Sequence, residues 1–186
     1  MDGLVGSETL EKRSVSAQRA LDDFCHNASS IIGTVPETEL PAKIAGLLPQ
    51  LMGVPGLLTD ADCAAPEVGY GRNTVFICPK GGFSILAMVW PAGVETPIHD
   101  HRDWCALGVY DGEIEETRFD AVDTAIAKET ARVTHETGVC GSLPWGAPNI
   151  HRIANRTDRR AISIHVYGGD CEKQGPNLET VYSLPS

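Results

Sequence analysis

The sequence predicts an all-β fold, an antiparallel β-barrel or jelly roll with an N-terminal helical segment. From Asn73 onward, short strand-forming stretches alternate with turn signals, and no helical stretch falls between them. This order favours antiparallel sheets, because parallel strands need long crossover connections. Helical spacing of apolar residues is confined to the first third of the chain. We expect a single domain over residues 1–186, with the helical segment at 1–68 and the barrel at 69–186.

The N-terminal segment predicts three helices. Apolar residues recur at helical spacing over 17–24, and either Ser14 or Ser16 can cap that helix. A second helix is expected around "AKIAGLLPQLM", after Thr34. A third, short helix is expected to begin at residue 59 or 60.

The second part of the chain predicts the strands of the barrel. Asp111-Gly112 is a strong signal for a tight hairpin turn. The expected strands lie in "NTVFICP", "GGFSILAMVW", "CALGVYDGEIEETRF", "AIAKETARV" and "RAISIHVY".

The composition is that of an ordinary globular chain, with 42% hydrophobic and 22% charged residues. A formal net charge of -10 and a pI of about 4.9 argue against a nucleic-acid partner, since nucleic-acid binders concentrate positive charge. The apolar runs are too short to span a bilayer and the first residues lack a leader pattern, so we expect a cytoplasmic protein without membrane contact. Six cysteines without a CxxC pair indicate reduced thiols. The sequence does not indicate an oligomeric state.

Two histidines stand one residue apart in "TPIHDHRDW". If His99 and His101 share a strand, their side chains point to the same face and can bind one metal ion. Asp103 would lie about 13 Å further along an extended strand, too far to share that ion. His151 follows a Pro/Gly-rich turn and opens another expected strand, so it is the third candidate ligand. The pair alone is equally typical of a sheet surface.

These motifs resemble those of the cupins, and among them the thiol dioxygenases. The residues that match the first cupin motif are Gly93, His99, His101 and Gly112. Cys105 stands where the glutamate ligand of many cupins falls. The residues that match the second motif are Pro144, Gly146, His151 and Asn155, with four residues rather than two between the glycine and the histidine.

The absence of that glutamate changes the chemistry of the expected site. Three neutral imidazoles leave the charge of a divalent ion uncompensated, so the ion is receptive to a thiolate. The resemblance implies one Fe(II) per chain, bound by His99, His101 and His151. Zinc also accepts three histidines and a water molecule, so a hydrolytic or structural zinc cupin is the rival interpretation.

A second group of polar residues follows the third histidine. Ser163, His165 and Tyr167 alternate along one expected strand and can line a single face. The simplest interpretation is a wet sheet face. Thiol dioxygenases, however, carry the same Ser-x-His-x-Tyr triad, in which the tyrosine lies beside the substrate and O2. The resemblance thus implies a catalytic triad of these residues.

The stretch "GYGRN" implies a substrate site. By itself Arg72 is typical of a solvated surface residue, but cysteine dioxygenases carry Tyr-x-Arg-Asn, whose arginine binds the substrate carboxylate. Tyr70, Arg72 and Asn73 reproduce it. The related 3-mercaptopropionate dioxygenases usually have glutamine here and an arginine about nine residues beyond the triad tyrosine. The corresponding stretch, "CEKQGPNLE", has no arginine.

The resemblance therefore implies a thiol dioxygenase that converts L-cysteine and O2 to cysteine sulfinic acid. The alternatives are oxidation of 3-mercaptopropionate or mercaptosuccinate, and a non-catalytic metal-binding cupin. Animal cysteine dioxygenases link a cysteine at the position of Cys105 to the triad tyrosine, so a thioether between Cys105 and Tyr167 is a further expectation. Buried cysteine is also a common core residue. Gly168-Gly169 and the shorter spacing from His101 to Cys105 depart from the animal pattern.

Overall fold

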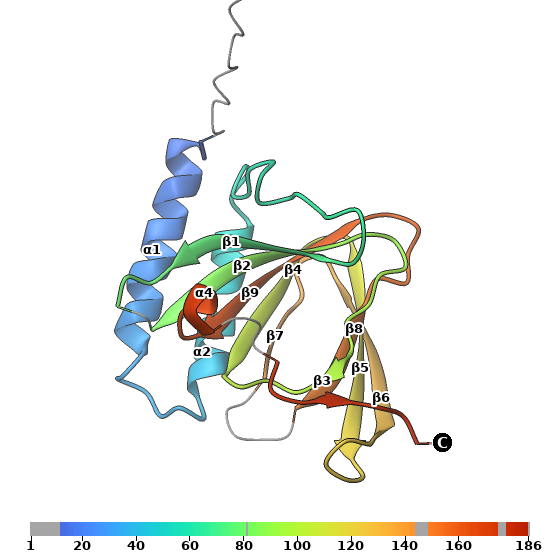
Figure 1. Ribbon diagram of the computed structural model, residues 1–186. Coiled ribbons are helices and arrows are strands. Elements are labelled where there is room, and N and C mark those ends of the chain that lie inside the picture. Colours follow the sequence, from blue (N-terminus) through green and yellow to red (C-terminus); the bar gives the residue numbers. More distant parts are fainter. Residues whose placement is uncertain (1–11, 81, 144–148, 175–177, 186) are drawn as a thin grey trace, which may run out of the picture.

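The computed structural model describes residues 12–80, 82–143, 149–174 and 178–185. Two five-stranded antiparallel sheets face each other and form a barrel, with the orders β1-β2-β9-β4-β7 and β10-β3-β8-β5-β6 (Figure 1). The strands are β1 (Gly71–Ile77), β2 (Phe83–Trp90), β3 (Ile98–His99), β4 (Cys105–Asp111), β5 (Glu113–Ala121), β6 (Ala127–Glu136), β7 (Cys140–Leu143), β8 (Ile150–Ala154), β9 (Ala161–Gly168) and β10 (Val181–Tyr182). Pro144 and Gly146 of the second cupin motif lie outside the described residues.

The helices lie against the outer face of the first sheet (Figure 1). Ser14 begins α1 (Val15–Ile31), since its hydroxyl accepts a hydrogen bond from the Ala17 amide. The expected second helix is divided into α2 (Leu40–Ala45) and α3 (Leu48–Met52). Pro49 explains the break, because proline has no amide hydrogen and fits only the first turn of a helix. A short α4 (Cys171–Gln174) follows β9.

Two strands of the first sheet are buried on both faces. Every residue of β2 and β9 is buried, which explains why both strands are mostly apolar, with Ser84, Ser163 and His165 as buried polar exceptions. Ile85 and Ile164 pack toward the helices, whereas Leu86 and Tyr167 pack inside the barrel. Alternation along the strands thus separates a helix-side core from a barrel interior that can carry polar groups.

The prediction of a third helix at residue 59 or 60 is wrong. Residues 60–63 form a turn, in which the Asp62 carboxylate accepts hydrogen bonds from the amide and hydroxyl of Thr59. Arg13 pairs with the same carboxylate at 2.6 Å. The reciprocal contacts of Thr59 and Asp62 are those of a helix capping box, and the Cys63 amide donates to the Thr59 carbonyl, but the helical turn does not continue beyond residue 63.

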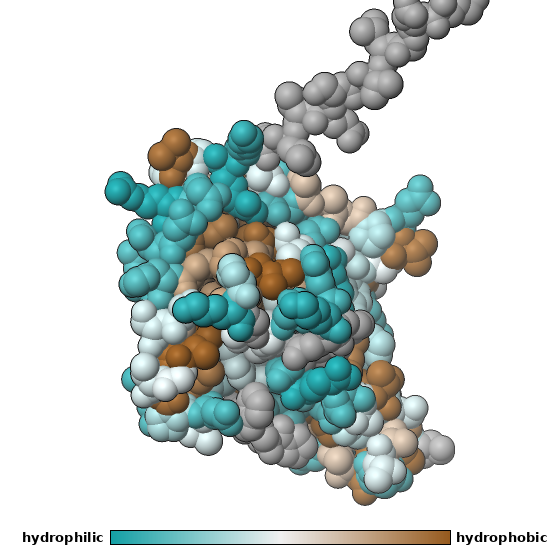
Figure 2. All heavy atoms as spheres, turned by 60° about the vertical axis from the view of Figure 1, so that its left-hand side comes forward, coloured by the Kyte–Doolittle hydropathy of each residue, from teal (hydrophilic) through white to brown (hydrophobic). Residues whose placement is uncertain are grey.

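The helix side of the molecule carries hydrophobic surface among hydrophilic side chains (Figure 2). A groove of about 660 Å³ runs between α1 and the residues of α3 and its flanks, and Ala20, Phe24 and Leu51 contribute its apolar lining. Within the part of the chain that the structure describes, no helix has both the length and the apolar character needed to cross a bilayer.

Candidate metal centre and adjoining cavity

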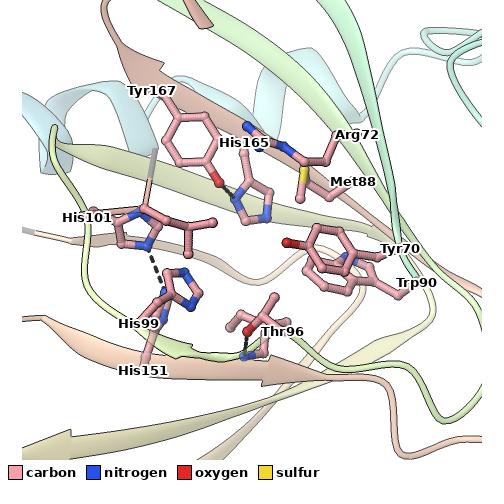
Figure 3. A pocket seen from close by; sticks show the side chains of 12 residues that line it. Tyr70, Arg72, Met88, Trp90, Thr96, His99, His101, His151, His165 and Tyr167 are labelled. Atoms are coloured by element: carbon pink, nitrogen blue, oxygen red, sulfur yellow. Dashed lines mark hydrogen bonds between the residues drawn. The ribbon is translucent and has the colours of Figure 1, made fainter. Parts of the chain in front are cut away.

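Three histidines meet inside the barrel. His99 on β3 and His151 on β8 face each other directly in the register of the two strands. His101 joins them, and the centroids of the three rings lie 4.8 to 4.9 Å apart (Figure 3). One candidate ligand atom from each ring lies within 4.8 Å of the others. The structure thus brings the three predicted ligands together.

His101 is not held by strand geometry, contrary to the expectation from alternation, because β3 ends at His99. A segment near the C-terminus fixes the residue between the two histidines instead. The Asp100 carboxylate accepts hydrogen bonds from the Thr180 amide at 2.6 Å and the Tyr182 hydroxyl at 2.8 Å. The backbone of Asp100 also donates to the Thr180 carbonyl and accepts from the Glu179 amide. These contacts hold the chain where it leaves the sheet.

The environment of two of the rings sets which nitrogen faces the cluster. The Pro97 carbonyl lies 2.9 Å from Nδ1 of His99, and the Glu116 carboxylate lies 3.0 Å from Nδ1 of His151. Both partners are acceptors, so each Nδ1 carries the hydrogen and each Nε2 is left to bind a cation. Burial, followed by the charge of His151, lowers the pKa of His99 to about 4. His99 is therefore a neutral imidazole near neutral pH, as metal ligation requires.

Glu116 is itself held as a carboxylate. Burial raises its pKa, but hydrogen bonds from His135 and His151 outweigh that effect and keep the pKa well below the ordinary value of a glutamate. Its side chain lies behind His151, and within the described residues no carboxylate belongs to the histidine cluster itself.

The donor set fits one divalent transition-metal ion. Metal–imidazole bonds of about 2.1 Å would hold two ligand nitrogens at most about 4.2 Å apart. The Nε2 atoms of His101 and His151 lie 2.8 Å apart, and all three candidate ligand atoms lie within 4.8 Å of one another, which is close to that limit. Three imidazoles suit iron, zinc, copper or nickel rather than magnesium or calcium, which prefer oxygen ligands.

A small cavity adjoins the histidines (Figure 3). It encloses about 30 Å³, which is room for one or two water molecules. A larger occupant would require movement of flexible side chains such as Met88. Its lining comprises Tyr70, Arg72, Met88, Trp90, Thr96, His99, His101, His151, Ile153, His165, Tyr167 and Leu178.

Arg72 reaches this cavity from β1, directly opposite Met88 on β2. The neighbouring Asn73 anchors the strand, since its amide group donates to the carbonyls of Asp62 and Ala64 at 2.8 Å. Among the described residues, Arg72 forms no ion pair, so its positive charge is available to an anion in the cavity. Tyr70 stacks on Trp90 with their ring centroids 5.1 Å apart.

The predicted triad forms a continuous hydrogen-bonded chain on the inner face of β9. Ser163 Oγ lies 2.9 Å from Nε2 of His165, and Nδ1 of the same ring lies 2.9 Å from the Tyr167 hydroxyl. Trp90 extends the chain by donating from Nε1 to Ser163 Oγ at 2.8 Å. Burial, followed by electrostatic interaction with His151 and Arg72, lowers the pKa of His165 to about 3, so this ring is neutral.

The direction of each hydrogen bond in this series of side chains determines where the Tyr167 hydroxyl hydrogen points. Because tryptophan can only donate, Ser163 accepts from Trp90 and gives its own hydrogen to His165. Nδ1 of the neutral His165 then donates to the Tyr167 oxygen. The phenolic hydrogen of Tyr167 is left for another acceptor, either the sulfur of Cys105 or a group in the cavity.

Several residues of the site were missed in the sequence analysis, among them Glu116, Trp90 and Leu178. Glu116 lies two residues after Ile114 on β5, so both side chains point to the same inner face. This spacing could have indicated its position from the sequence. Trp90 ends β2 on the face of Leu86 and Met88, and the same alternation could have found it. Leu178 carries no local signal, because only the tertiary fold brings it to the cavity.

Comparison with known proteins shows the family to which this chain belongs. The family model described as cysteine dioxygenase type I matches residues 65–173. The chain belongs to this family. Cysteine dioxygenase type 1 of Rattus norvegicus is 31% identical over 103 residues, which cover 53% of this chain and 50% of the rat protein. The zebrafish protein of the same name is 29% identical over the same share of both chains. The chain thus spans about half the length of the curated relatives it matches.

The fold of this cysteine dioxygenase type I family member is a cupin barrel, as predicted. A Klebsiella pneumoniae protein with a double-stranded β-helix domain superposes with a TM-score of 0.51 and 14% sequence identity. The superposition covers 67% of this chain and 94% of the other. A likeness at this identity concerns the architecture alone.

Proposed function

We propose that this protein is a mononuclear iron thiol dioxygenase whose substrate is a small thiol carboxylate, with L-cysteine as the preferred substrate. The observation that carries the proposal is the convergence of three imidazoles beside a cavity that also receives a buried tyrosine hydroxyl and an arginine without an ion pair among the described residues. Membership of the cysteine dioxygenase type I family supports it. The product is a sulfinic acid, and RSH plus O2 gives RSO2H without any further reductant.

In this proposal His99, His101 and His151 hold one Fe(II), which supplies the redox chemistry that joins sulfur to dioxygen. Arg72 binds the substrate carboxylate by charge and paired hydrogen bonds, and so orients the thiol toward the histidines. Tyr70 lines the same wall and stacks on Trp90. The cavity of about 30 Å³ must widen, for example by movement of Met88, to admit even a small substrate.

The triad of Ser163, His165 and Tyr167 positions one proton in this site. Because His165 donates to the tyrosine oxygen, Tyr167 can direct its hydrogen toward an oxygen or sulfur atom in the cavity. Ser163 keeps His165 in that tautomer. Such a positioned donor stabilises negative charge that develops during reaction.

Two rival functions remain to be tested against this proposal. No acidic side chain lines the described cavity to select an amino group, so 3-mercaptopropionate and mercaptosuccinate belong in a substrate panel. A non-catalytic or zinc-dependent cupin would use the same three histidines without consuming oxygen.

Oxygen uptake by iron-loaded protein distinguishes these functions. We expect uptake with cysteine, a product heavier by two oxygen atoms, and no uptake by the zinc-loaded protein or by the His151→Ala variant. Faster turnover of 3-mercaptopropionate or mercaptosuccinate would change the substrate but keep the chemistry. Metal binding without oxygen uptake for any thiol would identify a metal-binding cupin and contradict the proposal.

A further inference from the structure

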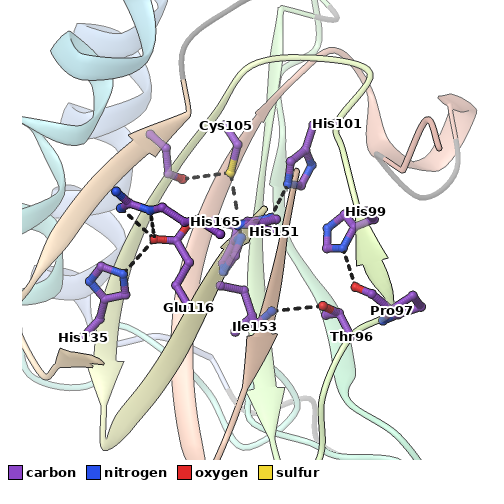
Figure 4. Close-up of polar contacts among 12 residues, drawn as sticks. Thr96, Pro97, His99, His101, Cys105, Glu116, His135, His151, Ile153 and His165 are labelled. Carbon is purple, nitrogen blue, oxygen red and sulfur yellow. Dashed lines mark hydrogen bonds and ion pairs between the residues drawn. The ribbon is translucent and has the colours of Figure 1, made fainter. Parts of the chain in front are cut away.

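A buried carboxylate lies directly behind one of the three histidines. Glu116 on β5 is 3% exposed, and its Oε1 lies 3.0 Å from Nδ1 of His151. His135 approaches Oε2 at 3.1 Å, and Arg118 donates to the same oxygen at 2.8 Å and 3.0 Å. Figure 4 shows His135 and His151 converging on Glu116 from different strands. A buried carboxylate is tolerated only when it is paired in this way.

The strand register places these groups together. Strand β5 pairs with β8 on one side and with β6 on the other. Arg118 faces His151 across the first pairing, and Ile114 faces His135 across the second. Glu116 lies two residues from each, on the same face, so it is the diagonal neighbour of both histidines.

We propose that Glu116 is a positioning residue for the metal centre, which fixes His151 for ligation through Nε2 and places a negative charge one imidazole away from the ion. The proposal rests on ligation by the three histidines and does not require thiol oxidation. Because both carboxylate oxygens only accept, Nδ1 of His151 must carry the hydrogen. Its Nε2 then faces the Nε2 of His101, 2.8 Å away.

This arrangement also changes the electrostatics of the site. Three neutral ligands alone leave a divalent ion uncompensated, and Cys105, whose thiol pKa is raised by burial, supplies no charge. The Glu116 carboxylate supplies it through the His151 ring, which becomes a more basic ligand. His135 and Arg118 hold the carboxylate in place from its other oxygen.

Zinc binding to the apo protein tests the proposal without any redox chemistry. Removal of a group that orients a metal-bound histidine typically costs 10 to 100-fold in metal affinity. We expect about that loss for Glu116→Gln, which removes the charge, and a loss at least as large for Glu116→Leu, which also removes the acceptor. Competition with a chromophoric chelator measures the affinities, and thermal unfolding of the apo proteins establishes that each variant is folded.

The matched control is Glu115→Gln, the same chemical change at the next residue. Glu115 pairs with Arg132 and Arg156 rather than with a histidine of the cluster. We expect zinc affinity of this variant to equal that of the wild type. Equal affinities of Glu116→Gln and Glu115→Gln would overturn the proposal.

Nitrogen-15 NMR of histidines in the zinc-loaded wild type tests the tautomer directly and needs no variant. We expect His151 to show a protonated, slowly exchanging Nδ1 and a metal-bound Nε2. Ligation through Nδ1 would overturn the role of Glu116 even if the variants fail to fold. If the wild type binds no zinc, the three-histidine site itself is wrong, and this proposal is wrong with it.

Discussion

Cys105 and Tyr167 face each other directly across strands β4 and β9. Both side chains are buried inside the barrel, where the Cys105 sulfur lies 3.9 Å from Nδ1 of His165 and the Tyr167 hydroxyl lies 2.9 Å from the same nitrogen. Burial raises the pKa of the Cys105 thiol, so it is protonated. A neutral thiol and a phenol are thus held beside the candidate metal centre.

The resemblance to animal cysteine dioxygenases implies a thioether between Cys105 and Tyr167, and their direct pairing across β4 and β9 is compatible with it. Its formation removes one hydrogen from the sulfur and one from the phenol ring, and in the proposed iron enzyme dioxygen would take up both hydrogens with their two electrons. Intact-mass measurement after aerobic incubation with iron and thiol should show a chain lighter by two hydrogen atoms. The change must vanish in Cys105→Ala and in Tyr167→Phe. An unchanged mass in active enzyme would mean that Cys105 serves packing alone.

Arg72→Ala should lower kcat/KM for cysteine. The corresponding loss of transition-state stabilisation should be about 2 to 5 kcal/mol, the usual cost of removing one partner of a desolvated charge pair. Most of the loss should appear in KM. Steady-state kinetics with cysteamine, which lacks the carboxylate, should show no comparable loss. The matched control is Arg132→Ala, which removes an exposed arginine paired with Glu129 and Glu115. Unchanged kinetics of Arg72→Ala with cysteine would contradict the assignment.

Tyr167→Phe should lower turnover by roughly tenfold to a thousandfold, because it removes one positioned proton donor. Its iron content should match that of the wild type. Trp90→Phe should lower turnover in the same direction, since it removes the donor that orients Ser163. Tyr110→Phe, the same change in the helix-side core, should leave turnover unaltered. Iron loss in Tyr167→Phe would identify the tyrosine as a ligating or structural group.

Gly71→Ala should destabilise the fold by about 1 to 3 kcal/mol, the usual cost of overpacking. An added Cβ at Gly71 would lie 2.6 Å from the Ala64 carbonyl oxygen and 3.2 Å from Cβ of Val89. Gly141→Ala is the control, because its Cβ would have no neighbour within 4 Å. Chemical denaturation of both variants measures the difference. Equal stability would show that β1 can shift without cost.

Much of the barrel could be predicted because alternation is a local property. The triad of Ser163, His165 and Tyr167 shares one face of β9 because successive side chains of a strand point to opposite faces. The hairpin at Gly112 could also be predicted, from the Asp-Gly pair. The structure gives the reason, because the φ of Gly112 is 81°, a conformation that favours glycine.

The rest depended on long-range contacts that carry no local signal. His101 lies beyond the end of β3, and its position depends on the contacts of Asp100 with Thr180 and Tyr182. The pairing of Glu116 with His151 requires the register of β5 against β8, which alternation alone does not determine. The contacts of Asp62 with Thr59 give the local signal of a helix start, but the helical turn ends at residue 63.

The pairing of β3 with β10 has a consequence for the order of events during synthesis. Asp100 and its partner Tyr182 are 82 residues apart in the chain, and Val181 faces His99. Both histidines of the HxH pair are therefore synthesised long before the segment that holds them in place. The loop closure that completes the cluster is one of the longest in the domain. Metal is thus expected to bind only after the segment that contains Thr180 and Tyr182 has been made.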